Sequence, residues 1–349
     1  MDNLFSLTID AGVFAVPHRT CSSADVEKYV QIILDCKKLV DESWVALYIS
    51  SKASDRLWDD CLYPIRGNLK NLLNTHGMME IDANTVGRVA DHLLGRAFFL
   101  EDHYKISDVL WDNLEVEPDI LTDSQSEGLR RDRARSVVIT AILQNHCESL
   151  KENFVLILKN APKNTVQLHA DIEILEHERD DIPAITKGFS GKVLICDSFS
   201  GLIECFKEDS LLENATNKDD IEFAIKIALY KQLLLDNGFV TSWEQIRTPK
   251  IGNRFTKSCN YVCSHNSDDT PIKIMRSIIE TCLDRNLSAV HALRKTRGGG
   301  SSQRVRSFDK ARAQRRDIDR DLHLHYWQHP DGTIELASIV HHDDMSIPE

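Results

Sequence analysis

Five of the chain's fourteen histidines lie in one stretch, LHLHYWQHPDGTIELASIVHHDD, residues 322–344. An imidazole has an ordinary pKa of about 6.5, so it can accept or donate a proton near neutral pH. Cleavage of RNA by its own 2′-hydroxyl needs a base for that hydroxyl, an acid for the leaving 5′-oxygen and cations for the phosphorane charge. These residue types therefore suit metal-independent cleavage of RNA.

The same stretch predicts two antiparallel strands joined by a turn at residues 329–332. With that turn, His323 pairs with Ser338, and alternation assigns the faces of the sheet. One face holds His323, His325, Trp327, Leu336, Ser338, Val340 and His342. The other, predicted to be core, holds Leu322, Leu324, Tyr326, Ala337 and Ile339. His323 and His342 then lie four residues apart along the sheet, on the order of 13 Å. A single scissile phosphate cannot bridge that distance unless a bulge shortens it.

The segment before this stretch is strongly basic. Residues 285–320 hold eleven Lys and Arg against three Asp, a charge of +8. Because the net charge of the whole chain is −12, the other residues together carry −20. Such separation of charge favours a strip that binds nucleic-acid phosphates. Docking of the strip on an acidic part of the chain, or on a partner, is the alternative. The predicted nucleic-acid contacts are Arg304, Arg306, Lys310, Arg312 and, by base stacking, Trp327.

The surrounding elements indicate an α+β or mixed α/β protein with several domains. Residues 272–287 carry apolar side chains at helical spacing after Pro271, a position where proline is tolerated. That helix, the basic connector and the two strands predict a small unit of helix plus antiparallel sheet. Polar, turn-rich residues 116–128 predict an earlier boundary. The predicted domains are a helix-rich mixed α/β domain at 1–125, an α/β regulatory or scaffold domain at 126–265 and the basic domain at 270–349.

From Ala311 to Asp344 the sequence resembles the RelE/YoeB family of bacterial toxins, which are ribosome-associated mRNA endoribonucleases. The shared pattern is an arginine pair, an Ile, an acidic residue, a strand ending in Tyr, a turn with Asp, an apolar strand and a histidine. Its matches here are Arg315, Arg316, Ile318, Asp321, residues 322–326, Asp331, residues 334–340 and His342. The resemblance implies a RelE-like last domain. The catalytic residues that it implies are Arg315, Arg316, His323 and His342.

Three departures from the family pattern matter. His323 stands where the toxins usually carry an arginine, and Asp343 follows His342 where they commonly have a tyrosine. The acidic general base of the YoeB branch has no clear match in residues 296–305. A catalytic set without these groups is either rewired, with histidine acting at neutral pH, or inactive.

Metal binding is the competing use of such groups. The run HHDD, residues 341–344, together with His323 or His325, offers ligands for Zn²⁺, Mn²⁺ or Mg²⁺ without an established spacing. A second partial set comprises Cys259, Cys263 and His265.

Asp10 follows an apolar strand in an order loosely similar to PIN-type nucleases, in which carboxylates at strand ends hold Mg²⁺. Its candidate partners are Asp55, Glu101, Asp102 and Asp197. Because a single Asp after a strand more often caps a turn, we expect neither a metal nor another cofactor.

The remaining composition excludes several classes of protein. No apolar run approaches the roughly 18 residues of a membrane span, and the first residues lack the basic segment of a secretory signal. Nine scattered cysteines fit free thiols in a reducing cytoplasm. We expect a cytoplasmic protein that binds RNA or another nucleic acid, with protein partners in a complex and no membrane.

Three functions stay open. The first is a toxin-like endoribonuclease that binds or cleaves RNA without a metal, as in bacterial antiphage defence. The second is a non-catalytic component of a defence complex that binds nucleic acid or a partner. The third is a metal-dependent nuclease.

Overall fold

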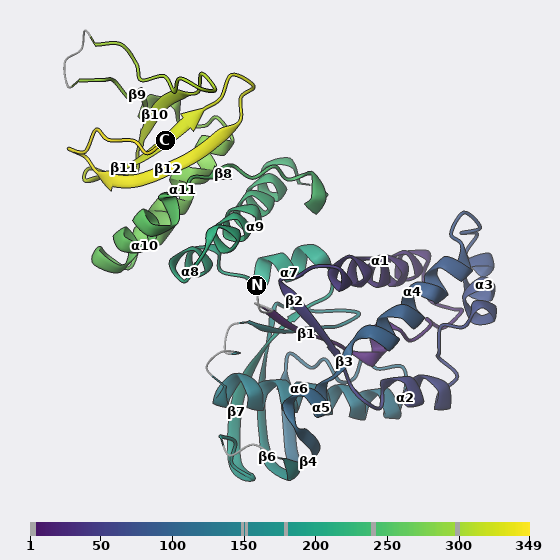
Figure 1. Cartoon of the computed structure of the whole chain (residues 1–349). Coiled ribbons are helices and arrows are strands. Elements are labelled where there is room, and N and C mark those ends of the chain that lie inside the picture. The colour runs from purple at the N-terminus through teal and green to yellow at the C-terminus, as the bar shows by residue number, and fades with distance from the viewer. Residues whose placement is uncertain (1–4, 148–149, 151–152, 178–180, 239–241, 297–300) are drawn as a thin grey trace. The chain divides into compact units, whose positions relative to one another are not determined.

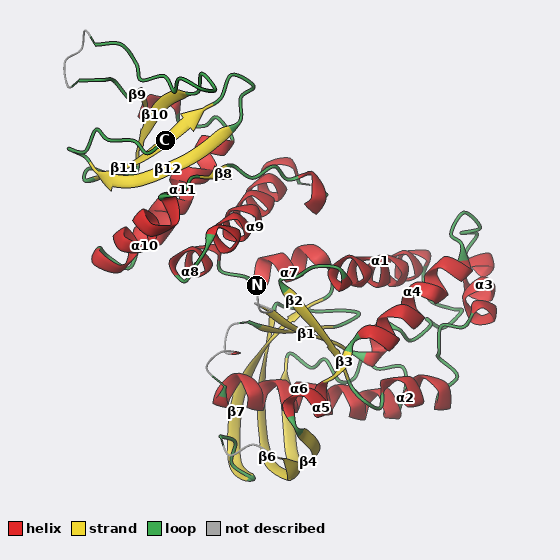
Figure 2. Ribbon diagram, in the orientation of Figure 1, coloured by secondary structure: helices red, strands yellow, loops and turns green. Residues whose placement is uncertain are grey.

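The computed structural model of this chain describes residues 5–147, 150, 153–177, 181–238, 242–296 and 301–349. The chain divides into two compact units, Met1–Phe206 and Lys207–Glu349 (Figure 1). Helices and strands occur in both units, and the second unit ends in a largely antiparallel sheet (Figure 2). The expected mixed α/β, multi-domain class is therefore confirmed. None of the described helices is long and apolar enough to cross a membrane.

Among the described residues, the first unit contains a seven-stranded sheet in the order β3-β2-β1-β5-β7-β6-β4. The strands are β1 Phe5–Ile9, β2 Val45–Ile49, β3 Phe98–Phe99, β4 Ile106–Glu117, β5 Phe154–Ile157, β6 Thr165–His177 and β7 Ile185–Cys196. The first five strands of that order run parallel, whereas β6 runs antiparallel to both of its neighbours. The strand order reverses between β1 and β5, so the carboxyl ends of these two strands form the topological switch point of the sheet.

Helices cover this sheet. They are α1 Ser23–Val40, α2 Ala53–Asp59, α3 Arg66–Thr75, α4 Ala83–Arg96, α5 Leu100–Tyr104, α6 Glu127–His146 and α7 Phe199–Cys205, with a 3-10 turn, η1, at Ala11–Val13. Strands β1, β2 and β5 consist of buried residues, as parallel strands with both faces covered should.

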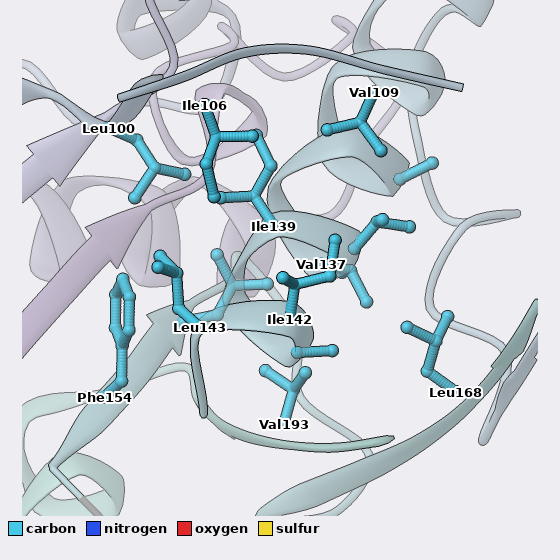
Figure 3. Packing of buried hydrophobic residues seen from close by; sticks show 14 of the residues in the cluster. Leu100, Ile106, Val109, Val137, Ile139, Ile142, Leu143, Phe154, Leu168 and Val193 are labelled. Carbon is cyan, nitrogen blue, oxygen red and sulfur yellow. The ribbon is translucent and has the colours of Figure 1, made fainter. Parts of the chain in front are cut away.

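Helix α6 lies in the core of the first unit, as Figure 3 shows. Its Val137 and Ile142 belong to one buried cluster with Ile106 of β4 and Val193 of β7. A helix that is apolar around much of its circumference is stable only when it is buried. This core joins residues from both sides of the boundary predicted after residue 125, so the structure has a single unit there.

The second unit combines helices with a five-stranded sheet in the order β8-β12-β11-β10-β9 among its described residues. Its helices are α8 Glu208–Glu213, α9 Lys218–Asn237, α10 Phe255–His265 and α11 Thr270–Cys282, with 3-10 turns η3 Trp243–Gln245 and η4 Leu287–Ala289. Its strands are β8 Lys250–Ile251, β9 Val290–Ala292, β10 Arg312–Asp317, β11 Leu322–Gln328 and β12 Ile334–His341. Neighbouring strands are antiparallel except for β8, which runs parallel to β12.

Helices α10 and α11 pack against one face of this sheet (Figure 1). Helix α11 ends at Cys282, before the predicted Leu287, because Asp284 and Asn286 adopt left-handed backbone angles, with φ of 51° and 46°. Helices α8 and α9 pack against α11, so the compact unit starts at Lys207 instead of at the predicted residue 270. The predicted domain 126–265 is consequently divided between the two units.

Candidate functional site

The hairpin of β11 and β12 has a different register from the predicted one. His323 pairs with Val340, and His325 pairs with Ser338. The register shifts between His325 and Tyr326, where Ala337 is the extra residue of a β-bulge in β12. His342 consequently lies two positions beyond the partner of His323 instead of four, about 7 Å along the strand. The two imidazole rings have their centroids 5.8 Å apart.

Between the turn and the bulge, two neighbouring residues lie on the faces opposite to those predicted, because the turn is one residue longer than expected. Leu336 pairs with Tyr326, which lies on the face toward the helices, whereas Ala337 packs with Trp327 on the opposite face. Beyond the bulge, the residues of β12 keep the faces predicted for them. The turn and the bulge each add one residue, and a total shift of two residues returns every side chain to its original face.

A carboxylate joins two histidines on the face that carries His323. Asp317 of β10 accepts a hydrogen bond from His291 of β9, with 3.2 Å between Oδ2 and Nε2. Its Oδ1 lies 3.1 Å from Nε2 of His323, in an orientation that makes the contact electrostatic rather than a hydrogen bond. We call His291, Arg315, Asp317, His323 and His342 the histidine cluster.

Burial differs sharply within the histidine cluster. His323 is buried, and its Nδ1 atom has no hydrogen-bond partner among the described residues. Burial lowers the pKa of His323, the positive charges of Arg315, His342 and His291 lower it further, and Asp317 opposes the change. The side chains of His342 and His291 are 60% and 45% exposed. The cluster thus presents two accessible imidazoles beside a buried third.

His325, on the same strand and face, is fully buried. Its Nδ1 lies 2.8 Å from the backbone oxygen of Ser346 and donates to it, since a carbonyl can only accept. Burial lowers the pKa of His325 to about 4, so this imidazole is neutral at pH 7.

Arg316 does not occupy the position predicted for a phosphate contact. It points to the face covered by helices, where it is 1% exposed, while Arg315 points to the other face. Its guanidinium donates to Glu280 at 2.8 Å and to the backbone oxygen of Arg285 at 2.6 Å. Alternation along β10 therefore makes Arg316 a buried structural residue.

Arg306 is likewise used inside the unit. Its guanidinium donates to Asp309 at 2.6 Å and to Glu335 at 2.7 Å, and the side chain is buried. These two hydrogen-bonded carboxylates raise the pKa of Arg306, so its charge is held by the protein and not offered to phosphate.

Trp327, predicted to stack on a base, is 1% exposed. It belongs to a small core with Leu293, Ala311, Ala313 and Ala337, against which Met345 and Ile347 pack. Its Nε1 donates to the backbone oxygen of Pro348 at 2.7 Å. Residues 345–348 thus cover the indole, and no base can stack on it in this arrangement.

The other predicted contacts stay nearer the surface. The side chain of Arg312 is exposed and has no hydrogen bond or ion pair among the described residues. Lys310 is exposed and donates to the backbone oxygen of Ser307, and Arg304 donates to that of Arg294. Residues 297–300, in the segment without a match for the YoeB base, lie outside the described residues.

In the first unit, Asp10 lies at the carboxyl end of β1, at the topological switch point. It is buried, and its Oδ2 accepts hydrogen bonds from Arg133 of α6 at 2.8 Å and from the backbone nitrogen of Gly12 at 3.1 Å. Its Oδ1 has no hydrogen-bond partner in the part of the chain that the structure describes. A β-carbon on Gly12 would stand 2.6 Å from Asp10 Oδ2, so glycine is required for this close approach.

Two further buried carboxylates lie near Asp10. The hydroxyl of Ser50 donates to Asp132 at 2.5 Å and to Glu101 at 3.3 Å. Burial raises the pKa of Asp132 to about 6, and the charges of Asp10 and Glu101 add to the rise. Arg135 lies 3.6 Å from Glu101.

The structure therefore brings Asp10 and Glu101 together but separates the other predicted partners. Asp55 on α2 and Asp102 on α5 are exposed, and Asp197 at the end of β7 pairs with Lys28 at 2.6 Å. Asp132 was missed by the sequence analysis. Its only signal is the charged run RRDRAR that leads into the apolar part of α6.

Metal ligation finds little geometric support. Within the described part of the chain, no three His, Cys, Asp or Glu side chains are arranged to hold a metal ion. Cys259 and Cys263 interact with each other on α10, and His265 Nδ1 lies 2.9 Å from the backbone oxygen of Tyr261.

No family model, curated protein or solved structure matches this chain.

Proposed function

We propose that the second unit cleaves single-stranded RNA without a metal ion, with the histidine cluster as the active site. The observation that carries this is that two exposed imidazoles gather around buried His323: the ring of His342 lies 5.8 Å from that of His323, and His291 is hydrogen-bonded to Asp317, which also contacts His323. Arg315 lies on the same face and supplies a positive charge for the phosphorane.

The two exposed imidazoles exchange protons with the substrate. His342 takes the proton of the 2′-hydroxyl as its oxygen bonds to phosphorus, and His291 gives a proton to the 5′-oxygen as the P–O5′ bond breaks. The products are a 2′,3′-cyclic phosphate and a 5′-hydroxyl. Asp317 contacts both His291 and His323. Together with buried His323, it holds the imidazoles of His291 and His342 in place.

The resemblance of residues 311–344 to RelE/YoeB toxins supports RNA as the substrate and a role in antiphage defence, on ribosomes or in a complex with other proteins. His323 and Asp343 depart from that family, so the chemistry assigned above rests on this chain's own histidines. All nine cysteines are free thiols in the structure, which agrees with a reducing cytoplasm as the site of action.

The test is incubation of the purified full chain with end-labelled RNA and DNA, with and without EDTA and ribosomes. We expect RNA cleavage that survives EDTA and leaves a 2′,3′-cyclic phosphate. Binding without any product would overturn catalysis and leave a non-catalytic nucleic-acid-binding component. That alternative is favoured by the burial of Arg316, one of the residues predicted to be catalytic.

A second candidate function is metal-dependent phosphodiester hydrolysis in the first unit. It is favoured by two buried oxygens at the carboxyl edge of the sheet, Asp10 Oδ1 and Asp132 Oδ2, for which the described residues provide no hydrogen-bond partner. Carboxylate oxygens are the ligands that Mg²⁺ prefers. This function predicts cleavage that stops in EDTA, leaves a 5′-phosphate and is lost in Asp132→Asn but retained in His342→Ala.

A further inference from the structure

The second unit contains a cavity of about 570 Å³ beside the carboxyl end of β11, the end of that strand opposite to His323. Its wall includes Lys218, Lys250, Asn253, Phe308, His329 and Glu335. That volume is within the range of small-molecule sites in proteins. We call this cavity the Phe308 pocket.

One wall of the pocket is an aromatic surface. Phe308 is 72% exposed, although moving a phenyl ring out of water lowers the free energy. The guanidinium carbon of Arg306 lies 4.7 Å from the centre of the Phe308 ring and 4.9 Å from that of Trp327. Because Asp309 and Glu335 fix Arg306 in place, it supports Phe308 from one side and leaves the rest of the ring open.

A second wall is cationic. The side chain of Lys250 is exposed and has no hydrogen bond or ion pair among the described residues, and that of Lys218 donates to Asn253 at 2.7 Å. The carboxylates of Asp309, Glu335 and Glu349 also line the pocket. Those of Asp309 and Glu335 are hydrogen-bonded to Arg306, so their charges are partly compensated. The two lysines therefore outnumber the remaining side-chain carboxylate, that of Glu349, and can attract an anion.

An open aromatic ring beside ammonium groups that are not paired with a carboxylate is the combination that binds a nucleotide of a single strand: the base stacks and the phosphate meets the cations. We propose that the Phe308 pocket holds one nucleotide of the RNA substrate, with the base on Phe308 and the phosphate at Lys218 and Lys250. This inference rests on the proposed function in taking RNA as the source of the nucleotide. His329 follows His323 by six residues along the sheet, about 20 Å, so the bound nucleotide lies beyond those at the cleaved bond.

The test is calorimetric titration of the full chain with adenosine 5′-monophosphate, adenosine and inorganic phosphate. Phe308→Ala should weaken binding of the monophosphate and of adenosine about tenfold or more. Lys250→Ala should weaken binding of the monophosphate and leave that of adenosine unchanged. The matched controls are Tyr261→Ala, which removes another exposed aromatic ring of the unit, and Lys257→Ala, which removes another exposed lysine.

Three results would overturn the subsite: no binding of the monophosphate, equal binding of phosphate alone, or binding unaffected by Phe308→Ala. Because Phe308 and Lys250 are exposed, both variants should keep the circular dichroism spectrum of the parent. Failure of the subsite can be told from failure of the proposed function. Cleavage without nucleotide binding removes only the subsite, whereas nucleotide binding without RNA cleavage removes only the catalytic assignment.

Discussion

The imidazoles of His323 and His342 lie with their ring centroids 5.8 Å apart and their planes inclined at 59°. The two residues belong to opposite strands of one hairpin, and the bulge at Ala337 brings them together. Without the two register shifts, the same hairpin would place them on the order of 13 Å apart. The geometry of the proposed active site therefore depends on two extra residues, one in the turn and one in the bulge of β12.

His342→Ala should lower the rate of RNA cleavage by about 10² to 10⁴, the usual contribution of a group that transfers a proton. His341→Ala is the matched control, because His341 is also exposed but alternation along the strand directs it to the opposite face of the sheet. The measurement is the rate of release of the 2′,3′-cyclic phosphate product. Equal rates in the two variants would exclude His342 from the chemistry.

Asp317→Asn should reduce the cleavage rate while leaving KM nearly unchanged, because Asp317 orients His291 and His323 and does not itself bind substrate. The carboxylate raises the pKa of His323, so its removal should lower that pKa further. Titration of the histidine ring protons by NMR measures the change. Asp321→Asn, at an exposed neighbour, should alter neither quantity, and an unmoved His323 titration in Asp317→Asn would contradict the contact.

Stability should fall as the pH drops from 6.5 to 4, in part through His325. The pKa of this buried imidazole is about 4, below the ordinary 6.5, so between these values the unfolded chain binds the proton more readily. The contribution amounts to about 3 kcal/mol, present above pH 6.5 and lost below pH 4. Urea unfolding at several pH values should show a smaller loss in His325→Asn than in the parent. Parallel losses in the two proteins would show that His325 does not titrate in this range.

Arg316→Ala should destabilise the second unit by about 3 kcal/mol, because Glu280 and two backbone oxygens would lose a buried partner. Arg312 lies four residues before Arg316 in the same strand and is exposed. Arg312→Ala should therefore change the free energy of unfolding by less than about 0.5 kcal/mol. Urea unfolding followed by tryptophan fluorescence measures both. The opposite order would place Arg316 at the surface.

Gly12→Ala should destabilise the first unit by about 1–3 kcal/mol, the usual cost of forcing an extra methyl group into a packed site. The new β-carbon would stand 2.6 Å from Asp10 Oδ2 and 2.8 Å from Arg133 Nη2, so the buried ion pair would have to move. Gly67→Ala on α3 meets nothing within 4 Å and should leave stability unchanged or slightly raised. Thermal unfolding of the full chain compares them, and equal stability of the two variants would contradict a rigid pair.

The sequence alone was sufficient for features that depend on neighbouring residues. Alternation of apolar and polar side chains predicted the strands β11 and β12, and it placed His323, His325 and Trp327 on one face correctly. Asp10 could be chosen because a polar residue that ends a parallel strand lies at the edge of the sheet where the other carboxyl ends meet.

Tertiary structure alone decided which of these residues can act. The pairing register depends on the turn and on a bulge, neither of which the period of two reveals, and so the separation of His323 and His342 was predicted wrongly. The charge of a segment likewise does not say which of its arginines lie beneath helices, and Arg306 and Arg316 form internal ion pairs because their strands and loops point them inward. Trp327 is buried by residues 345–348, and Asp132 joins Asp10 only because α6 packs against the sheet that carries β1. Such contacts between distant segments are set by packing of the whole unit, so local sequence patterns could not contain them.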